Sequence, residues 1–113
     1  MTITAKVFYS GGQLTGSAAT YYTSPALTTS VITQAVFTNV DTAAHTITAY
    51  VVRSAGTASA SNTLISAYSL APGQAYPSPE LVGVTLAPGD FIQALADTGA
   101  KVTLSGIYGY VIQ

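Results

Sequence analysis

The tetrapeptide Leu-Ala-Pro-Gly occurs twice in this chain, at residues 70–73 and 86–89. Proline has a backbone φ that suits the second position of a tight turn, and glycine tolerates the positive φ that the third position of a type II turn requires. Each copy therefore predicts a strand that ends in a sharp reversal. The sequence around the two copies does not repeat, so they indicate recurrent turn chemistry within one domain.

The segments between the turns have the composition of β-strands. Thr, Ser, Val, Tyr and Ala dominate, residues that favour helices are scarce, and Gly or Pro recurs every few residues. The predicted strands cover residues 2–9, 29–39, 46–53, 63–70, 91–96 and 101–112, with a weaker strand at 14–25 and an edge segment at 75–86. This spacing predicts an all-β fold, an antiparallel β-sandwich or jelly roll of about seven or eight strands, in a single domain over residues 1–113.

Two hairpins and three buried faces follow from the pattern. The strand at 46–53 is expected to pair with 29–39, and 101–112 with 91–96. The first strand is expected to bury Ile3, Ala5, Val7 and Tyr9, and the last strand to place Val102, Leu104, Tyr108, Tyr110 and Ile112 on one face. Neither face of the strand at 29–39 is polar, which predicts that other protein covers its second face.

Charge is the most unusual property of the composition. Charged residues are 6% of the chain and the net charge is −1, against about 25% charged residues in ordinary soluble domains. Such a surface is expected to associate with protein. Lys6, Arg53 and Lys101 are too few to neutralise several phosphates, which excludes electrostatic binding of nucleic acid.

The same composition bears on membranes, export and disulfides. No apolar stretch approaches the roughly 20 residues of a membrane-spanning helix, so a membrane partner is not expected. The N-terminus lacks the apolar core of a signal peptide, which predicts synthesis in a cytoplasm without export. The absence of cysteine excludes disulfides and thiolate metal sites.

One short motif suggests catalysis. Asp97-Thr98-Gly99 resembles the active-site loop of retroviral-type aspartic proteases, in which two carboxylates from two chains activate water. Only sixteen residues follow Asp97, too few for the segments that must come after that loop. We therefore expect a hairpin turn in which Asp97 caps its own backbone and Gly99 has a positive φ.

The other polar candidates also favour structural roles. His45 is the only histidine, which excludes a histidine-based metal cluster or triad, and it is expected to begin a strand at the mouth of a loop. Glu80, Asp90 and Asp97 suggest calcium, but there is no dense Asp/Asn loop, so solvated turn carboxylates are expected. No enzyme activity, cofactor or metal is predicted.

Tyr21, Tyr22 and Tyr76 offer two interpretations. Together they would form a platform on which a sugar stacks, and separately they are ordinary strand and interface residues. Glu80 lies between two prolines and an apolar segment, where it is expected to pair with a basic residue, across a subunit boundary if there is one.

The order of several motifs resembles that of a known class of proteins. A Thr-Asn strand end at 38–39, the first LAPG turn, Pro-Glu-Leu at 79–81 and the pattern L-x-PGD-x-I-x-A at 86–94 follow one another. In this the chain, from about residue 31 to 106, resembles small β-sandwich virion proteins of tailed bacteriophages, both head decoration (cement) proteins and tail accessory subunits. The resemblance covers about two thirds of the sequence.

The resemblance implies a non-enzymatic structural protein on the capsid surface, made in the host cytoplasm, which binds the major capsid protein and stabilises the head shell as a homo-oligomer, with a trimer favoured. The alternative is a tail-fibre or baseplate module that binds host carbohydrate or receptor through Tyr21, Tyr22 and Tyr76. Residues 1–24 are expected to form an extended strand or arm that reaches neighbouring subunits. The expected partner contacts are Ile3, Lys6, Phe8, Tyr21, Tyr22, Tyr76 and Glu80.

Overall fold

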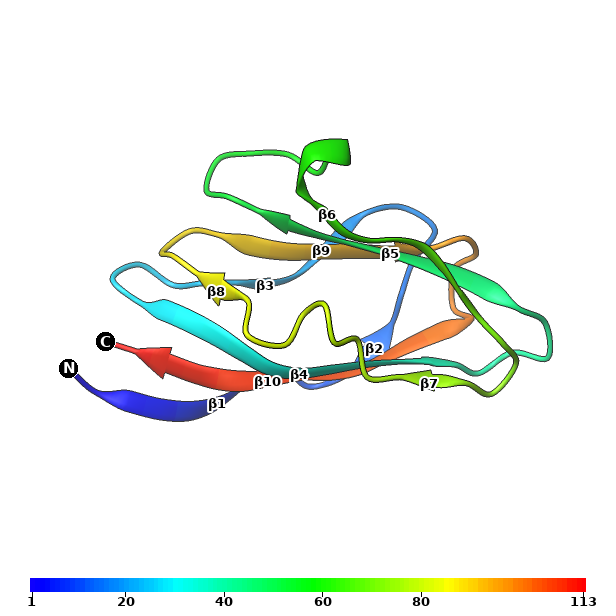
Figure 1. Ribbon diagram of the computed structural model, residues 1–113, viewed down its shortest axis with the longest axis horizontal. Coiled ribbons are helices and arrows are strands. Elements are labelled where there is room, and N and C mark those ends of the chain that lie inside the picture. Colours follow the sequence, from blue (N-terminus) through cyan, green and yellow to red (C-terminus); the bar gives the residue numbers. More distant parts are fainter.

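The alternating β-branched and aromatic segments form strands throughout the chain. The computed structural model describes residues 1–113 as two antiparallel β-sheets packed face to face (Figure 1). The strands are β1 (Ile3–Tyr9), β2 (Gly12–Gln13), β3 (Ala19–Thr23), β4 (Thr29–Asn39), β5 (His45–Val52), β6 (Thr63–Leu70), β7 (Ala75–Tyr76), β8 (Thr85–Leu86), β9 (Phe91–Ala96) and β10 (Val102–Ile112), with one 3-10 turn, η1 (Ala60–Asn62). The predicted all-β sandwich is confirmed. No helix has the length and hydropathy of a membrane span.

Each sheet has a simple order. Sheet A is β1-β10-β4-β7, with β2 also paired to β10 and β8 to β4, and sheet B is β3-β9-β5-β6. In Figure 1, sheet B lies above sheet A. One open side of the sandwich lies between β1 and β3, and the other lies between β7 and β6.

The core lies between the sheets and contains 19 buried hydrophobic residues in one cluster. Its largest members include Phe37 of β4, Ile47 of β5, Ile92 of β9 and Ile107 of β10. Burial of each such side chain contributes about 1.5–3 kcal/mol. The core draws on both sheets, so neither sheet buries its inner face without the other.

Both predicted hairpins are wrong. Strands β4 and β5 belong to different sheets, and so do β9 and β10, so the two connections cross the sandwich. The first crossing is held by Asn39, whose buried Nδ2 donates to the carbonyls of Ala43 (2.8 Å) and Leu70 (3.1 Å). Its Oδ1 accepts the N–H of Asp41 at 2.9 Å. Asn39 therefore joins the end of a sheet A strand to the end of β6 in sheet B.

Bulges in β4 and β10 change which side chains face the core along each strand. In β4 the inner face passes from Ile32 to Ala35, because two consecutive residues between them are both exposed. In β10 it passes from Leu104 to Ile107 across a register shift. Such an extra residue reverses the alternation of side chains beyond it. The predicted face of β10 is therefore wrong for Tyr108, Tyr110 and Ile112, which lie on the outer face of sheet A.

The predicted buried face of β1 is also wrong for Ile3, Ala5 and Val7, whereas Tyr9, beyond a register shift, is half-buried against the core. Ile3 and Val7 are 59% and 55% exposed, and Ala5 is exposed as well, whereas Phe8 is buried at 9%. The reason is that β1 is an edge strand whose outer face has no covering layer. Residues 1–24 contain β1, β2 and β3, and each of these strands is paired within the two sheets.

The two predicted LAPG turns are confirmed. The N–H of Gln74 donates to the carbonyl of Ala71, and the N–H of Asp90 donates to that of Ala87, both at 3.0 Å. The glycines at 73 and 89 have φ values of +76° and +87°, as a type II turn requires. The segment between the turns contains the short edge strands β7 and β8, as expected from its prolines.

Candidate interaction surface

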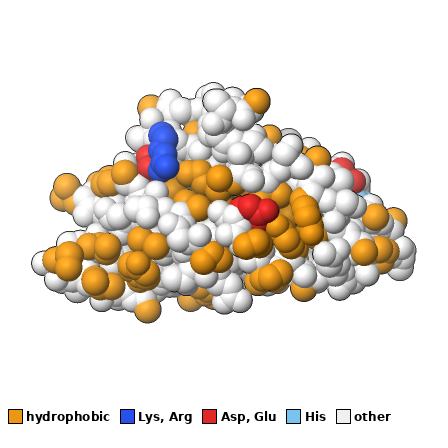
Figure 2. All heavy atoms as spheres, viewed as in Figure 1, with side chains coloured by type: hydrophobic (Ala, Val, Ile, Leu, Met, Phe, Trp, Pro, Cys, Tyr) orange, Lys and Arg blue, Asp and Glu red, His pale blue; other side chains and the backbone are white.

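The outer face of sheet A is an uncharged surface built from three strands. It consists of Ile3, Ala5 and Val7 of β1, Tyr108, Tyr110 and Ile112 of β10, and Thr29 and Val31 of β4. Ile3, Ala5 and Val7 of β1 lie beside Ile112, Tyr110 and Tyr108 of β10, respectively. No residue of this face carries a charge. Figure 2 shows apolar side chains along the lower border of the molecule, where sheet A lies, and few charged groups on the face in view.

Three of the predicted partner contacts lie on β1 and have different environments. Ile3 and Lys6 are exposed, so both are accessible to a partner. Phe8 is buried: its ring stacks on that of Tyr22 at 4.3 Å between centroids. Phe8 therefore belongs to the core.

The three tyrosines of the predicted sugar platform are not brought together. Tyr21 packs edge-on against Tyr9, with ring centroids 5.1 Å apart, at the β1/β3 side of the sandwich, and Tyr22 stacks on Phe8 at the same side. Tyr76 stacks on Tyr68 at 4.2 Å, at the β6/β7 side. These aromatic pairs close the two open sides of the sandwich.

Tyr76 also binds Glu80. Its hydroxyl donates to the Glu80 carboxylate, with Oε2 at 2.7 Å. Burial, the hydrogen bond to Glu80 and the negative charge of that carboxylate together raise the pKa of Tyr76 to about 12. Glu80 therefore fixes a tyrosine of its own chain, and it forms no ion pair with a basic residue of that chain.

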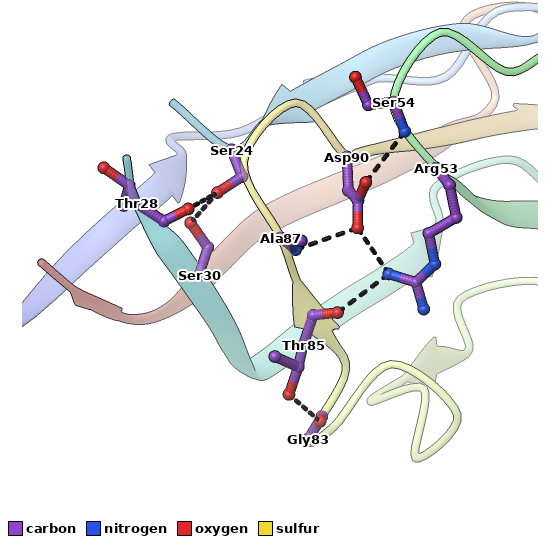
Figure 3. Close-up of polar contacts among 9 residues, drawn as sticks. All are labelled: Ser24, Thr28, Ser30, Arg53, Ser54, Gly83, Thr85, Ala87 and Asp90. Atoms are coloured by element: carbon purple, nitrogen blue, oxygen red, sulfur yellow. Dashed lines mark hydrogen bonds and ion pairs between the residues drawn. The ribbon is translucent and has the colours of Figure 1, made fainter. Parts of the chain in front are cut away.

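Asp90 is the most densely bonded carboxylate (Figure 3). Its Oδ2 accepts from Arg53 Nη1 at 2.7 Å and from the N–H of Ala87 at 3.0 Å, and its Oδ1 accepts from the N–H of Ser54 at 2.9 Å. Burial raises the pKa of Asp90, but the hydrogen bonds from Arg53 and the two backbone groups outweigh it and hold the pKa below its usual value. The expectation of a solvated turn carboxylate is wrong here, because Asp90 is buried.

A second polar cluster adjoins the same turn. The buried Ser24 hydroxyl donates to the carbonyl of Thr28 at 2.9 Å and lies 2.9 Å from the hydroxyl of Ser30, as Figure 3 shows. Ser30 in turn contacts the Tyr22 hydroxyl at 2.8 Å. Sequence reasoning missed Ser24, and the only signal for it was the Pro at position 25, which marks the end of β3.

His45 begins β5 at the mouth of a loop, as predicted, and lies between two carboxylates. Its Nε2 is 2.7 Å from Asp41 Oδ2 and its Nδ1 is 2.8 Å from Asp97 Oδ1. The pKa of His45 is raised mainly by its hydrogen bond to Asp41 and next by its hydrogen bond to Asp97. The same bond with His45 lowers the pKa of Asp41. A ring protonated on both nitrogens satisfies both carboxylates.

The protease-like motif serves the same contact. Asp97 bonds to His45 and not to its own turn, and the positive φ falls on Ala100 (61°) and not on Gly99, so both details of the predicted turn are wrong. Glu80, Asp90 and Asp97 lie in separate clusters. No group of three metal-ligating side chains is placed to hold an ion, and the surface has no pocket.

Comparison with known proteins adds no relative. No protein-family model, no curated protein and no solved structure matches this chain.

Proposed function

We propose that this chain is a non-enzymatic structural subunit of a tailed-phage virion, a decoration protein that binds the assembled head shell and stabilises it. The outer face of sheet A carries the proposal. It presents exposed Ile3, Val7 and Tyr108 with no charge among its members, which is the composition of a protein-binding surface. The order of motifs between residues 31 and 106, similar to that of small virion sandwiches, supports the phage setting.

The proposed mechanism is cohesion through many copies. Each copy buries apolar and neutral hydrogen-bonding surface across adjacent capsid subunits. A weak contact becomes effective when several are made at once, because binding of one raises the effective concentration of the next. A homo-oligomer that presents several such faces to a lattice of repeated sites meets this condition.

The first test is the copy number in purified particles of the phage that encodes the chain, measured by quantitative mass spectrometry against the major capsid protein. We expect hundreds of copies per particle. A few or a few dozen copies would place the chain in the tail and favour the carbohydrate-binding alternative, and absence from the particle would refute a virion role.

The second test uses particles that lack the chain, to which the purified protein is added back. Saturable binding is expected for the natural sequence and for Val82→Lys, because Val82 is exposed but lies outside the outer face of sheet A. Val31→Lys, in the β4 part of that face, is expected to bind at least tenfold more weakly. Equal binding of both variants would show that another surface meets the shell.

A further inference from the structure

Strand β1 is the one edge of the sandwich with a long, regular register. From Ile3 to Val7 it pairs with β10 without a break. The other edges are interrupted or short: the pairings of β3 and β6 contain register shifts, and β7 and β8 have two residues each. Irregular and short edges resist the addition of another strand. Strand β1 is therefore the edge best able to accept one.

The backbone groups available on β1 follow from its pairing with β10. Thr2 and Gln113 exchange two hydrogen bonds, of 2.7 and 2.9 Å. Since hydrogen-bonded and non-hydrogen-bonded pairs alternate in an antiparallel ladder, Ile3, Ala5 and Val7 direct their N–H and C=O groups away from β10. These residues form a row of donors and acceptors at the open edge of sheet A.

We propose that β1 pairs antiparallel with β1 of a second copy of this chain, with Ala5 opposite Ala5. In this register Ile3 of each copy lies opposite Val7 of the other, so exposed apolar side chains meet apolar side chains. The paired edges form about six backbone hydrogen bonds. The two-fold axis keeps the outer faces of both sheets on the same side, so the uncharged surface becomes continuous across the dimer.

A second copy fits this edge because the strand is complementary to itself. Lys6 is the only charged residue of β1, and in this register it lies opposite Thr4 and not opposite another lysine. The two Lys6 side chains are diagonal neighbours, about 7–8 Å apart. Their repulsion weakens the pairing and is screened by salt. Dimerisation should therefore strengthen as NaCl is added. Binding of a partner strand with acidic residues would instead weaken as NaCl is added.

Cysteine cross-linking tests the register directly, because the chain has no cysteine of its own. Hydrogen-bonded pairs have Cα atoms about 5.5 Å apart, within the range that a disulfide spans. Under mild oxidation, Ala5→Cys is expected to give a covalent dimer on a non-reducing gel. Val82→Cys is the control, since Val82 is 53% exposed and lies away from β1. Cross-linking of Ala5→Cys no faster than the control would overturn the proposal.

Sedimentation velocity over a range of concentrations measures the association itself. We expect a monomer–dimer equilibrium for the natural sequence and for Val82→Lys, and at least tenfold weaker dimerisation for Val7→Lys. Both valines are similarly exposed, so circular dichroism should report an intact fold for both variants. A monomer at every concentration, a trimer, or no effect of Val7→Lys would refute the pairing. The pairing and the virion role can fail separately, because dimerisation is measured without particles.

Discussion

The two LAPG turns lie at opposite ends of the sandwich, yet the same pair of backbone hydrogen bonds joins each to a buried polar residue (Figure 1). After β6, the N–H of Gly73 donates to the carbonyl of Asn39, whose N–H donates to the carbonyl of Gln74, both at 3.0 Å. After β8, the N–H of Gly89 donates to the carbonyl of Ser24, whose N–H donates to the carbonyl of Asp90, both at 2.9 Å. The repeated tetrapeptide is therefore a repeated docking element.

The two ends differ in the side chain that completes the turn. Gln74 Oε1 accepts the N–H of Ala71 at 2.8 Å and closes its own turn. Asp90 accepts the equivalent N–H of Ala87 and in addition binds Arg53 and Ser54 in the loop after β5. One backbone arrangement therefore accepts a neutral or a charged side chain, and only the charged side chain connects separate parts of the chain.

Replacement of the charged side chain should cause the largest loss of stability. Asp90→Ala leaves the N–H groups of Ala87 and Ser54 without their acceptor, which should lower the free energy of unfolding by roughly 2–4 kcal/mol. Urea unfolding measures the loss. Asp90→Asn is the control and should lose less, since one carbonyl oxygen remains as an acceptor. A loss no greater than that of Gln74→Ala would mean that the contacts with the loop add nothing.

Substitution of the turn glycines should also distinguish the two ends, with a smaller difference in the free energy of unfolding. Both positions have positive φ, so Gly73→Ala is expected to lose about 1–2 kcal/mol from backbone strain alone, because its Cβ would meet no atom within 4 Å. Gly89→Ala should lose more, because its Cβ would come within 2.5 Å of Ser54 Oγ. Thermal unfolding of the two variants side by side decides this. Equal losses would show that Ser54 moves aside freely.

The two ends should also respond oppositely to pH. The lowered pKa of Asp90 gives stability that is present above about pH 3.9 and is lost as the pH falls through the lower folded value. The raised pKa of His45, at the Gln74 end, gives stability that is present below about pH 6.5 and is lost as the pH rises through the higher folded value.

Unfolding midpoints measured from pH 5 to pH 9 should therefore fall for the natural sequence and stay nearly level for His45→Gln. His45 is the only histidine, so no other imidazole contributes. The same fall in both proteins would show that the His45 cluster is not its source.

The smallest effect is expected at the neutral turn. Gln74→Ala removes one hydrogen bond of a half-buried side chain and should lower the free energy of unfolding by roughly 0.5–1.5 kcal/mol. Gln74→Glu isolates the contribution of the ion pair, because its carboxylate accepts the same N–H but has no arginine like Arg53 beside it. If Gln74→Glu raised the free energy of unfolding by as much as Asp90→Ala lowers it, the ion pair between Asp90 and Arg53 would not matter.

Local chemistry made the strands and turns predictable. The strands at 29–39, 63–70 and 91–96 have the bounds that composition and turn residues predicted, and both LAPG turns have the expected φ values. These features depend on neighbouring residues alone. For the same reason the sequence identified His45 as the start of a strand.

What could not be predicted depends on contacts distant in sequence. Which sheet receives β5 or β10 depends on how both sheets bury their faces, and a bulge such as that between Leu104 and Ile107 leaves no reliable mark in an apolar sequence. The partners of Asn39 and Asp90 are similarly remote: Leu70 and Arg53 lie far along the chain. A polar residue at the end of a strand indicates its hydrogen-bond partner only when the strand ends that lie next to it in the fold are known.

Strand β10 lies between β1 and β4 although it is the last strand to be made. On the ribosome, sheet B has all four of its strands by residue 96, while β1 and β4 wait for the strand that joins them. Such late pairing of distant segments slows folding and leaves apolar strands exposed to other nascent chains. Cell temperature and chaperone supply during synthesis should therefore affect the yield of this protein more than its final stability would suggest.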